Sequence, residues 1–306
     1  MNDLITILGV TATGKTRLAI ELARILDGEI ISADSRQVYK GMDIGTGKDL
    51  QEYSTGGNPV PYHLIDIVDP GYEYNVYEFN RDFYKIYDNI VSRGKMPVMC
   101  GGSGLYLDSV ISGYELKKVP ANKFLRKNLE EFDDDELIRK LKSYGPLHNV
   151  TDILDRDRLV RAIEIAEFEL KNVGEKEEHE PVSSINFGIK FDRETIRNRI
   201  TERLHNRMEN GLIEEVKDLL ESGLTPEQLM FYGLEYKYIT MHLAGELGFD
   251  EMFAQLNIAI HQFAKKQMTW YRRMEKKGVK IHWIDGTINL DHKVTVVMGI
   301  LRNYQG

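Results

Sequence analysis

Short apolar runs alternate with a helix-like segment along the first hundred residues of the chain. The apolar runs are typical of buried strands and occupy residues 4–8, 29–33, 62–67 and 97–100. The segment at 76–92 instead repeats large apolar side chains every three or four positions, which predicts a helix with one buried face. This alternation predicts an α/β fold in which a parallel sheet is flanked by helices.

The pattern of hydrophobic and polar residues changes after about residue 113, and no clear strand pattern follows until residues 184–191. Charged, helix-like segments fill the interval, at 123–132, 134–143 and 155–171. Beyond it, the pattern predicts helices at 194–210, 212–222, 229–242 and 249–276, a strand at 279–284 and a helix at 290–303. We therefore predict a core formed by residues 1–112 and 184–306, interrupted by a helical insertion at 113–183.

Composition is that of an ordinary globular protein. The 306 residues are 42% hydrophobic and 29% charged, which is enough apolar material for a sizeable core. Cys100 is the single cysteine, so no intramolecular disulfide can form. No run has the features of a signal peptide or the length of a membrane span, and we expect a cytoplasmic protein without membrane contacts.

The formal net charge of -8 argues against a general nucleic-acid binder, because such proteins neutralise phosphates with lysine and arginine. A local basic groove stays open as an interpretation. One cluster of basic residues falls in the predicted helix after residue 192 and comprises Arg193, Arg197, Arg199, Arg203 and Arg207. Such runs are more often solvated helix faces than binding sites.

Residues 9–16, Gly-Val-Thr-Ala-Thr-Gly-Lys-Thr, match the phosphate-binding pattern G-x-x-x-x-G-K-[ST] between a predicted strand and a predicted helix. Glycine lets backbone N–H groups curl around an anion, and the helix N-terminus favours negative charge. The candidate phosphate ligands are Gly9, Thr11, Ala12, Thr13, Gly14, Lys15 and Thr16. Lys15 would meet the terminal phosphate, and the Thr16 hydroxyl would hold Mg²⁺. The alternative is a chance match.

Two other predicted strands end in chemically distinctive residues. Asp34 follows the strand at 29–33, and Gly101-Gly102-Ser103-Gly104 follows the strand at 97–100. Since the carboxyl ends of parallel strands line one edge of a sheet, we expect Asp34 and Ser103 beside the phosphate loop. Asp34 is equally typical of a turn and Ser103 of a helix N-cap, so these purely structural roles stay open.

Glycine-rich stretches at 41–48 and 54–59 are expected to be mobile surface loops. Leu64-Ile65-Asp66 could represent the aspartate-bearing strand that assists Mg²⁺ in nucleotide hydrolases, although an apolar run ending in Asp is a weak signal. A kinase or a nucleotide hydrolase is the general expectation for a phosphate loop. The sequence lacks N-K-x-D, which disfavours a small GTPase.

Six segments spread over most of the chain carry a more specific pattern. They are GVTATGKT at 9–16, ISADSRQVYKGMDIGTGK at 31–48, HLIDIVDP at 63–70, GGSGLY at 101–106, DRDRLVRAIE at 155–164 and AKKQMTWYRR at 264–273. The segment at 31–48 is the most distinctive. Together they resemble the tRNA dimethylallyltransferases, the isopentenyl transferases that modify the adenosine on the 3′ side of the anticodon.

The resemblance implies a P-loop NTPase-like fold and transfer of dimethylallyl from dimethylallyl diphosphate to N6 of that adenosine, with release of pyrophosphate. In the family, the phosphate loop holds the diphosphate leaving group with Mg²⁺. Lys15, Thr16 and Ser103 match the groups that stabilise its charge. Asp34 matches the general base for the exocyclic amine, which is a poor nucleophile. Lys266 occupies a diphosphate-binding position that is commonly arginine.

The resemblance also implies that the enzyme binds the anticodon stem-loop of tRNA, and we expect a monomer. The target base would enter a channel from the side opposite the diphosphate, and Gln37 has the donor and acceptor needed to read a base edge. The residues that match tRNA-contacting positions are Asp34, Ser35, Arg36, Gln37, Ser103, Asp157, Arg158 and Arg161. For the insertion arginines, an ordinary solvated helix face remains the alternative.

The chain departs from the usual family pattern at several positions. Ser103 stands where threonine is usual, His261 and Lys266 stand where arginine is common, and Glu235-Tyr236-Lys237 replaces Gly-Tyr-Arg. The insertion also looks short. These departures affect fine tRNA contacts more than the reaction class. Three alternative functions stay open: an isopentenyl transferase for free adenine nucleotides, an ATP-dependent small-molecule kinase, and a phosphate-loop protein that only binds RNA.

Overall fold

The computed structural model describes residues 4–114, 116–145, 153, 155–172 and 182–305. The chain divides into two compact units, each considered separately. The first unit comprises Met1–Tyr114 and His179–Gly306, and the second comprises Glu115–Glu178.

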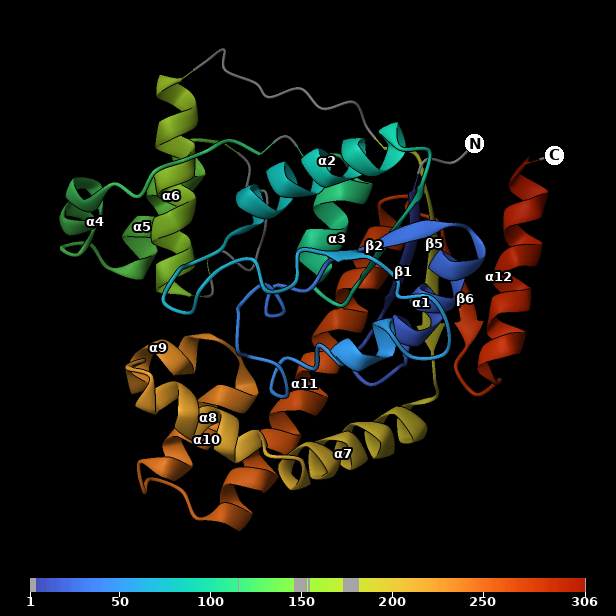
Figure 1. Cartoon of the computed structure of the whole chain (residues 1–306). Coiled ribbons are helices and arrows are strands. Elements are labelled where there is room, and N and C mark those ends of the chain that lie inside the picture. The colour runs from blue at the N-terminus through green and yellow to red at the C-terminus, as the bar shows by residue number, and fades with distance from the viewer. Residues whose placement is uncertain (1–3, 115, 146–152, 154, 173–181, 306) are drawn as a thin grey trace. The chain divides into compact units, whose positions relative to one another are not determined.

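The first unit is built around a six-stranded sheet in the order β3-β2-β4-β1-β5-β6, with every pair of neighbours parallel (Figure 1). The strands are β1 (Leu4–Gly9), β2 (Gly28–Ser32), β3 (Tyr62–His63), β4 (Met96–Gly101), β5 (Ser184–Lys190) and β6 (Ile281–Asp285). This confirms the predicted α/β fold with a parallel sheet. The carboxyl ends of β1, β2 and β4 meet at one edge, since Leu8 pairs with Gly101 and Ser32 with Cys100.

Helices cover both faces of this sheet (Figure 1). The helices of this unit are α1 (Lys15–Ile25), α2 (Val76–Ser92), α3 (Gly104–Ile111), α7 (Arg193–Glu209), α8 (Leu212–Glu221), α9 (Pro226–Phe231), α10 (Leu234–Leu243), α11 (Phe249–Lys276) and α12 (Leu290–Gln305), with a 3₁₀ turn, η1, at Leu50–Tyr53. Of these, α8, α9 and α10 pack against one another, with α8 also on α7 and α10 on α11. Side chains alternate along β1: Leu4 and Leu8 join the core under α2, α3 and α11, while Ile5 and Ile7 join the core under α1 and α12.

Two predicted elements were wrong in extent. The strand expected at 62–67 stops at His63, because Leu64 (φ 61°) and Asp66 (φ 55°) adopt left-handed backbone conformations. The following residues pair with another loop instead: the Asp66 N–H donates to the Gln37 carbonyl oxygen over 3.1 Å. The helix expected at 229–242 is split into α9 and α10 at Gly233, whose φ of 141° is incompatible with a helix.

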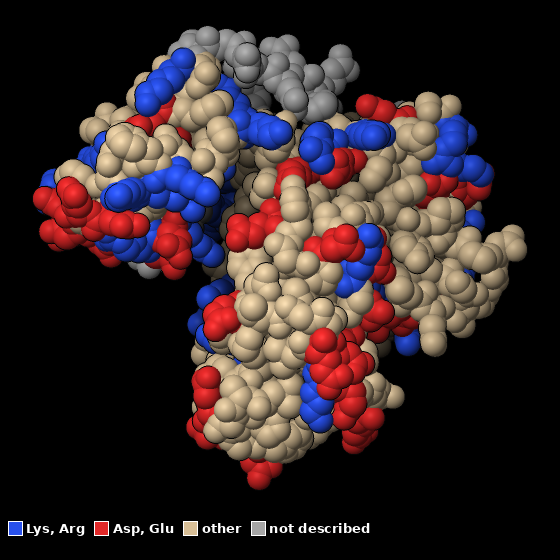
Figure 2. Space-filling view, turned by 60° about the vertical axis from the view of Figure 1, so that its left-hand side comes forward, with Lys and Arg blue, Asp and Glu red and all other residues tan. Residues whose placement is uncertain are grey.

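The second unit is a small helical layer. Its helices are α4 (Lys123–Leu129), α5 (Asp134–Ser143) and α6 (Arg156–Lys171). Five buried side chains form its own core: Leu129, Leu137, Leu141, Leu159 and Ile163. Acidic and basic side chains are mixed on the surface of this unit that faces the viewer in Figure 2.

Candidate active site

The phosphate loop between β1 and α1 is shaped by its own contacts. Gly14 (φ 80°) and Ala12 (φ 62°) both have left-handed backbones, which a tight anion-binding turn requires. The Thr13 hydroxyl donates to the Val10 carbonyl oxygen over 2.9 Å, and the Lys15 Nζ donates to the same oxygen over 3.0 Å. The lysine is thereby held across the turn by a weak neutral acceptor that a phosphate oxygen can replace.

Lys15 interacts electrostatically with two other charged groups of this edge. Burial lowers the pKa of Lys15, the positive charge of Arg203 lowers it further, and the negative charge of Asp34 raises it. Strand pairing brings the two loops to the same edge of the sheet, because β4 pairs with β2 on one side and with β1 on the other.

Asp34 keeps part of its carboxylate available. Its Oδ1 accepts the Arg36 N–H over 2.9 Å, which is a turn contact of the kind expected of aspartate after a strand. Its Oδ2 makes no hydrogen bond with the residues that the structure describes. Asp34 therefore stabilises the turn with one carboxylate oxygen and can accept a proton with the other.

Ser103 joins the ends of β2 and β4. Its Oγ accepts the Ser35 N–H over 2.9 Å and donates to the Ser35 Oγ over 3.2 Å. Although Ser103 occupies the N-cap position of α3, its side chain makes no capping hydrogen bond. Ser103 is thus the N-cap of α3 by position, as the sequence suggested, while its hydroxyl fixes the start of the 35–37 segment.

The glycines before Ser103 are required by close approach. A Cβ on Gly101 would lie 2.1 Å from the Ala33 carbonyl oxygen, and one on Gly102 would lie 2.6 Å from the Gln267 Nε2. Both distances are shorter than real Cβ contacts allow, so a side chain at Gly101 would push the ends of β2 and β4 apart, and one at Gly102 would displace the Gln267 amide.

Arg36 and Gln37 are both in contact with protein groups. The Arg36 guanidinium lies 5.2 Å from the centroid of the Phe231 ring. The Gln37 Oε1 accepts from the Ser32 hydroxyl over 2.9 Å, and its Nε2 donates to the Gly47 carbonyl oxygen over 3.1 Å. A Gln37 amide that reads a base would do so with its second N–H and second lone pair.

The segment at 41–48, expected to be a mobile surface loop, is instead anchored. The Glu215 carboxylate accepts the backbone N–H groups of Asp43, Ile44 and Gly45 over 2.9, 2.7 and 2.9 Å. The Tyr236 hydroxyl donates to the same carboxylate over 2.7 Å. One side chain of α8 thus fixes the loop that supplies the Gly47 acceptor. Sequence reasoning did not identify Glu215.

Lys48 anchors the other end of that segment. Its side chain is completely buried and donates to the Tyr39 carbonyl oxygen over 2.7 Å, to Asp43 Oδ1 over 2.6 Å and to Asp66 Oδ1. Asp66 therefore serves as an ion-pair partner of Lys48 and lies outside any strand, so the comparison with the aspartate-bearing strand of hydrolases was wrong.

Three arginines of α7 contact this edge of the sheet. Arg199 Nε donates to the Ala12 carbonyl oxygen over 2.9 Å, and Arg203 contacts Thr11 Oγ1 at 3.4 Å and Asp49 Oδ2 at 2.9 Å. Arg207 contacts the Gly45 carbonyl oxygen at 3.4 Å. Sequence reasoning recognised the cluster but favoured a solvated face. Their spacing of four residues was the available signal for one shared helix face.

Comparison with known families identifies the chain. The model of a family described as IPP transferase matches residues 37–274, and one described as isopentenyl transferase matches residues 2–60. The first match covers more than half of the sequence. The chain belongs to the IPP transferase family.

Individual relatives agree with this assignment over nearly the whole length. A tRNA dimethylallyltransferase of Parabacteroides distasonis is 51% identical over 301 residues, covering 98% of each chain. One of Geotalea daltonii is 56% identical over 285 residues, covering 93% of this chain and 91% of its own. The crystal structure of the tRNA isopentenylpyrophosphate transferase from Bacillus halodurans superposes with a TM-score of 0.72 at 30% identity, covering 99% and 96% of the two chains.

The position of Thr16 in this member of the IPP transferase family is compatible with a Mg²⁺ ligand. Thr16 lies in the first turn of α1 directly after Lys15, and its hydroxyl makes no hydrogen bond with the described residues. A threonine hydroxyl is an oxygen donor of the type that Mg²⁺ prefers, with the remaining positions filled by phosphate and water. Among the described residues, no three His, Cys, Asp or Glu side chains gather as a metal site.

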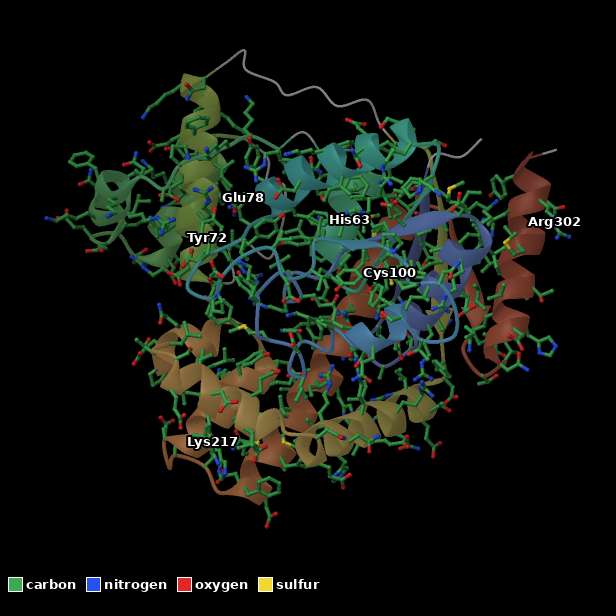
Figure 3. All side chains as sticks on the ribbon, viewed as in Figure 1. His63, Tyr72, Glu78, Cys100, Lys217 and Arg302 are labelled. Atoms are coloured by element: carbon green, nitrogen blue, oxygen red, sulfur yellow. The ribbon has the colours of Figure 1, made fainter. Side chains whose placement is uncertain are left out.

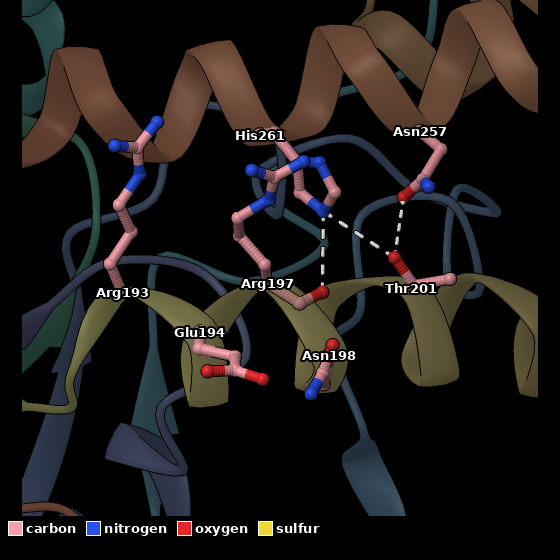
Figure 4. Close-up of a pocket in the computed structure, with 7 residues that line it drawn as sticks. All are labelled: Arg193, Glu194, Arg197, Asn198, Thr201, Asn257 and His261. Atoms are coloured by element: carbon pink, nitrogen blue, oxygen red, sulfur yellow. Dashed lines mark hydrogen bonds between the residues drawn. The ribbon is translucent and has the colours of Figure 1, made fainter.

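Two residues at departures from the family pattern lie apart from the contacts described above. Lys266 is exposed, whereas its neighbour Gln267 contacts the phosphate loop. The His261 Nε2 hydrogen-bonds with the Thr201 Oγ1 and the Arg197 carbonyl oxygen at 3.4 and 3.2 Å (Figure 4). His261 lines an open pocket of about 590 Å³ between α7 and α11, whose other lining residues are Arg193, Glu194, Arg197, Asn198, Thr201 and Asn257 (Figure 4).

The insertion residues fall into two groups. Asp157 and Arg158 are exposed at the start of α6. Arg161 is engaged inside its own unit, where it donates to Glu164 Oε2 over 3.0 Å and to the Val119 carbonyl oxygen over 2.8 Å. Of the two insertion arginines predicted to contact RNA, Arg158 therefore has the freer guanidinium.

Proposed function

We propose that this protein transfers a dimethylallyl group from dimethylallyl diphosphate to N6 of the tRNA adenosine next to the anticodon on its 3′ side. The names of the relatives support a tRNA prenyl transfer. The observation that carries the proposal is that the strand ends before Asp34 and before the phosphate loop meet at one edge of the sheet, on either side of β4. A base and an anion cradle at one edge are what an alkylation with a diphosphate leaving group needs.

The chemistry balances with these groups. The N6 lone pair forms a bond to C1 of the prenyl group while the C1–O bond breaks, and the bonding electrons leave with the diphosphate. Asp34 accepts the proton that N6 loses. Lys15, the phosphate-loop N–H groups and the neighbouring Arg203 stabilise the negative charge that grows on the leaving group, and the Ser103 hydroxyl holds the segment that follows Asp34.

Mg²⁺ is the proposed cofactor, and Thr16 is the residue that would hold it. When bound, the ion would neutralise part of the diphosphate charge and improve the leaving group. Gly9, Ala12, Thr13 and Gly14 remain proposed diphosphate contacts through the loop backbone.

The proposed RNA partner is the anticodon stem-loop. Ser35, Arg36 and Gln37 are proposed to meet the target nucleotide, and Asp157 and Arg158 the stem-loop, with Arg161 bracing α6. No described helix has the length and apolar character needed to cross a membrane. A monomer acting in the cytoplasm, and a diphosphate contact by Lys266, stay predictions.

One experiment tests donor, acceptor and bond formation together. Unmodified tRNA is incubated with the protein, Mg²⁺ and dimethylallyl diphosphate, and its nucleosides are analysed by mass spectrometry. We expect one prenyl increment on adenosine and none when ATP replaces the donor. Modification of free AMP but not tRNA would favour the free-nucleotide transferase, and ATP consumption with a small acceptor would favour the kinase.

Asp34→Asn tests the proposed base. We expect turnover to fall by about 100-fold or more while tRNA binding is kept, since general base catalysis typically contributes about 10²–10⁴-fold. Asp88→Asn, an exposed position on α2, is the matched control and should leave turnover unchanged. Full activity of Asp34→Asn would remove Asp34 from the mechanism.

A further inference from the structure

Two buried side chains of α11 connect the phosphate loop with the loop that precedes Ser103. Gln267 and Tyr271 are one helical turn apart, 7% and 0% exposed. The Gln267 Oε1 accepts the Thr11 N–H over 3.0 Å, and its Nε2 donates to the Gly102 carbonyl oxygen over 2.8 Å. The Tyr271 hydroxyl lies 3.0 Å from the Gly9 carbonyl oxygen and 3.3 Å from that of Gly102. Both side chains thus join the ends of β1 and β4.

The contacts of Gln267 require one acceptor and one donor at the end of its side chain. One atom accepts from a backbone N–H and the other donates to a backbone carbonyl, which the amide does at every pH and a carboxyl group does only when protonated. An ionised glutamate would place a second oxygen against the Gly102 carbonyl oxygen. An apolar residue would leave a buried N–H and a buried carbonyl without these partners.

The hydrogen bond between Thr11 and Gln267 also shows where the backbone N–H of Thr11 points. Because the Thr11 N–H is bonded to Gln267, it is not aimed at the anion cradle, although Thr11 belongs to the loop sequence. Thr11 is therefore held by α11 rather than contributing its N–H to the ligand, and the position of the loop depends on the helix.

The proposed reaction depends on the distance between the two loops that this helix connects. The diphosphate is proposed to lie in the loop at 9–16, while Ser103 holds the segment next to the base Asp34. A misplacement of about 1 Å between reacting groups can cost about 100-fold in rate. We infer that Gln267 and Tyr271 are positioning residues that set the phosphate loop against the Ser103 strand end, an inference that rests on the proposed function.

The first test separates binding from turnover in Gln267→Met, which keeps the side-chain length and removes both hydrogen bonds. We expect kcat for tRNA prenylation to fall by about 10-fold or more, in line with a small misplacement, while the Kd for pyrophosphate changes less than about 3-fold. Gln262→Met, exposed on the same helix, is the control and should match the wild type in both.

The second test uses Gln267→Glu, because the protonated acid reproduces the amide pattern with one acceptor and one donor. We expect the ratio of its kcat to the wild-type kcat to rise about 10-fold between pH 8 and pH 6. The other ionisable groups around the two loops are the same in both proteins, so the ratio isolates the new carboxyl; they are Lys15, Asp34, Cys100, Arg203 and Tyr271. A merely structural contact would lower the unfolding midpoint without this pH-dependent recovery.

The possible results distinguish a failure of this inference from a failure of the proposed function. If Gln267→Met does not fold, Tyr271→Phe carries the kcat test with the ring packing preserved. Wild-type kcat in the folded Gln267 variants, or a flat kcat ratio across pH, would refute the inference alone. A wild-type protein without prenyl transfer would refute the proposed function and this inference with it.

Discussion

Replacing the buried lysine of the 41–48 loop gives a sharp test of how that loop is held. Lys48 is completely buried and donates to two carboxylates and one carbonyl oxygen. Lys48→Met preserves most of the side-chain length while removing the charge and all three hydrogen bonds. Asp43, Asp66 and the Tyr39 carbonyl would then lose their partner.

The expected cost follows from the burial of each partner. Breaking a fully buried ion pair costs about 3–5 kcal/mol, because an uncompensated charge remains inside the protein. Here the side chains of Asp43 and Asp66 are 53% and 33% exposed, so water can solvate both carboxylates once the lysine is gone. We therefore expect a loss near the lower limit, about 2–3 kcal/mol in the free energy of unfolding.

Urea unfolding monitored by tryptophan fluorescence measures this loss, because Trp270 and Trp283 both pack against the core of the sheet unit. Lys95→Met is the matched control. Lys95 pairs with Asp27 at the surface, where the two side chains are 35% and 80% exposed, and such pairs contribute about 1 kcal/mol or less. Equal losses in the two variants would show that Lys48 does not anchor the loop.

Three further predictions concern other charged contacts. Hydrogen bonds from Arg93 hold the pKa of Glu29 at about 2, below its usual 4.5. The ionised Glu29 therefore stabilises the fold above pH 4.5, and this contribution is lost as the pH falls toward 2. The thermal unfolding midpoint of Glu29→Gln should vary less with pH over that interval than the midpoint of the wild type. Glu215→Ala should raise the KM for tRNA about 10-fold by releasing the loop, whereas the exposed neighbour variant Glu214→Ala should not, and equal KM values would contradict the loop contact. Arg203→Gln should lower kcat/KM for dimethylallyl diphosphate by about 10-fold with partial rescue in Arg203→Lys, and steady-state kinetics showing no loss would exclude its charge from the cradle.

The local elements were predictable because their signals lie within a few residues of one another. The apolar spacing of α2 placed it at Val76–Ser92, and the Asn75 side chain and Glu78 form a capping box at its start. The strand pattern also indicated that the ends of β1, β2 and β4 meet at one edge of the sheet, as their pairing shows. What failed locally was the run after His63, where apolar residues suggested a strand although the chain turns to meet Lys48.

The connections between distant segments could not be read from the sequence. Glu215 is more than 160 residues from the loop that it fixes, and nothing in the pattern of α8 distinguishes it from its acidic neighbours. Periodicity placed Arg199, Arg203 and Arg207 on one side of a helix but not against the phosphate loop. Cys100, labelled in Figure 3, is a chemically distinctive residue without a role in the site. Burial raises the pKa of its thiol to about 12 although the charge of Lys15 lowers it, which fits an inert core residue.

These distant connections explain why the chemistry-bearing loops need the whole core around them. A phosphate loop exposes backbone N–H and carbonyl groups that must either meet a ligand or find a partner in the protein. In this fold the partners come from the carboxy-terminal half: Gln267 for the Thr11 N–H, Tyr271 for the Gly9 carbonyl, and Glu215 for the loop at 43–45. The Thr16 hydroxyl and one oxygen of Asp34 make no hydrogen bond with the described residues, and the proposed reaction uses both of them. The same helices that satisfy the loops thus also select which polar groups remain for substrate.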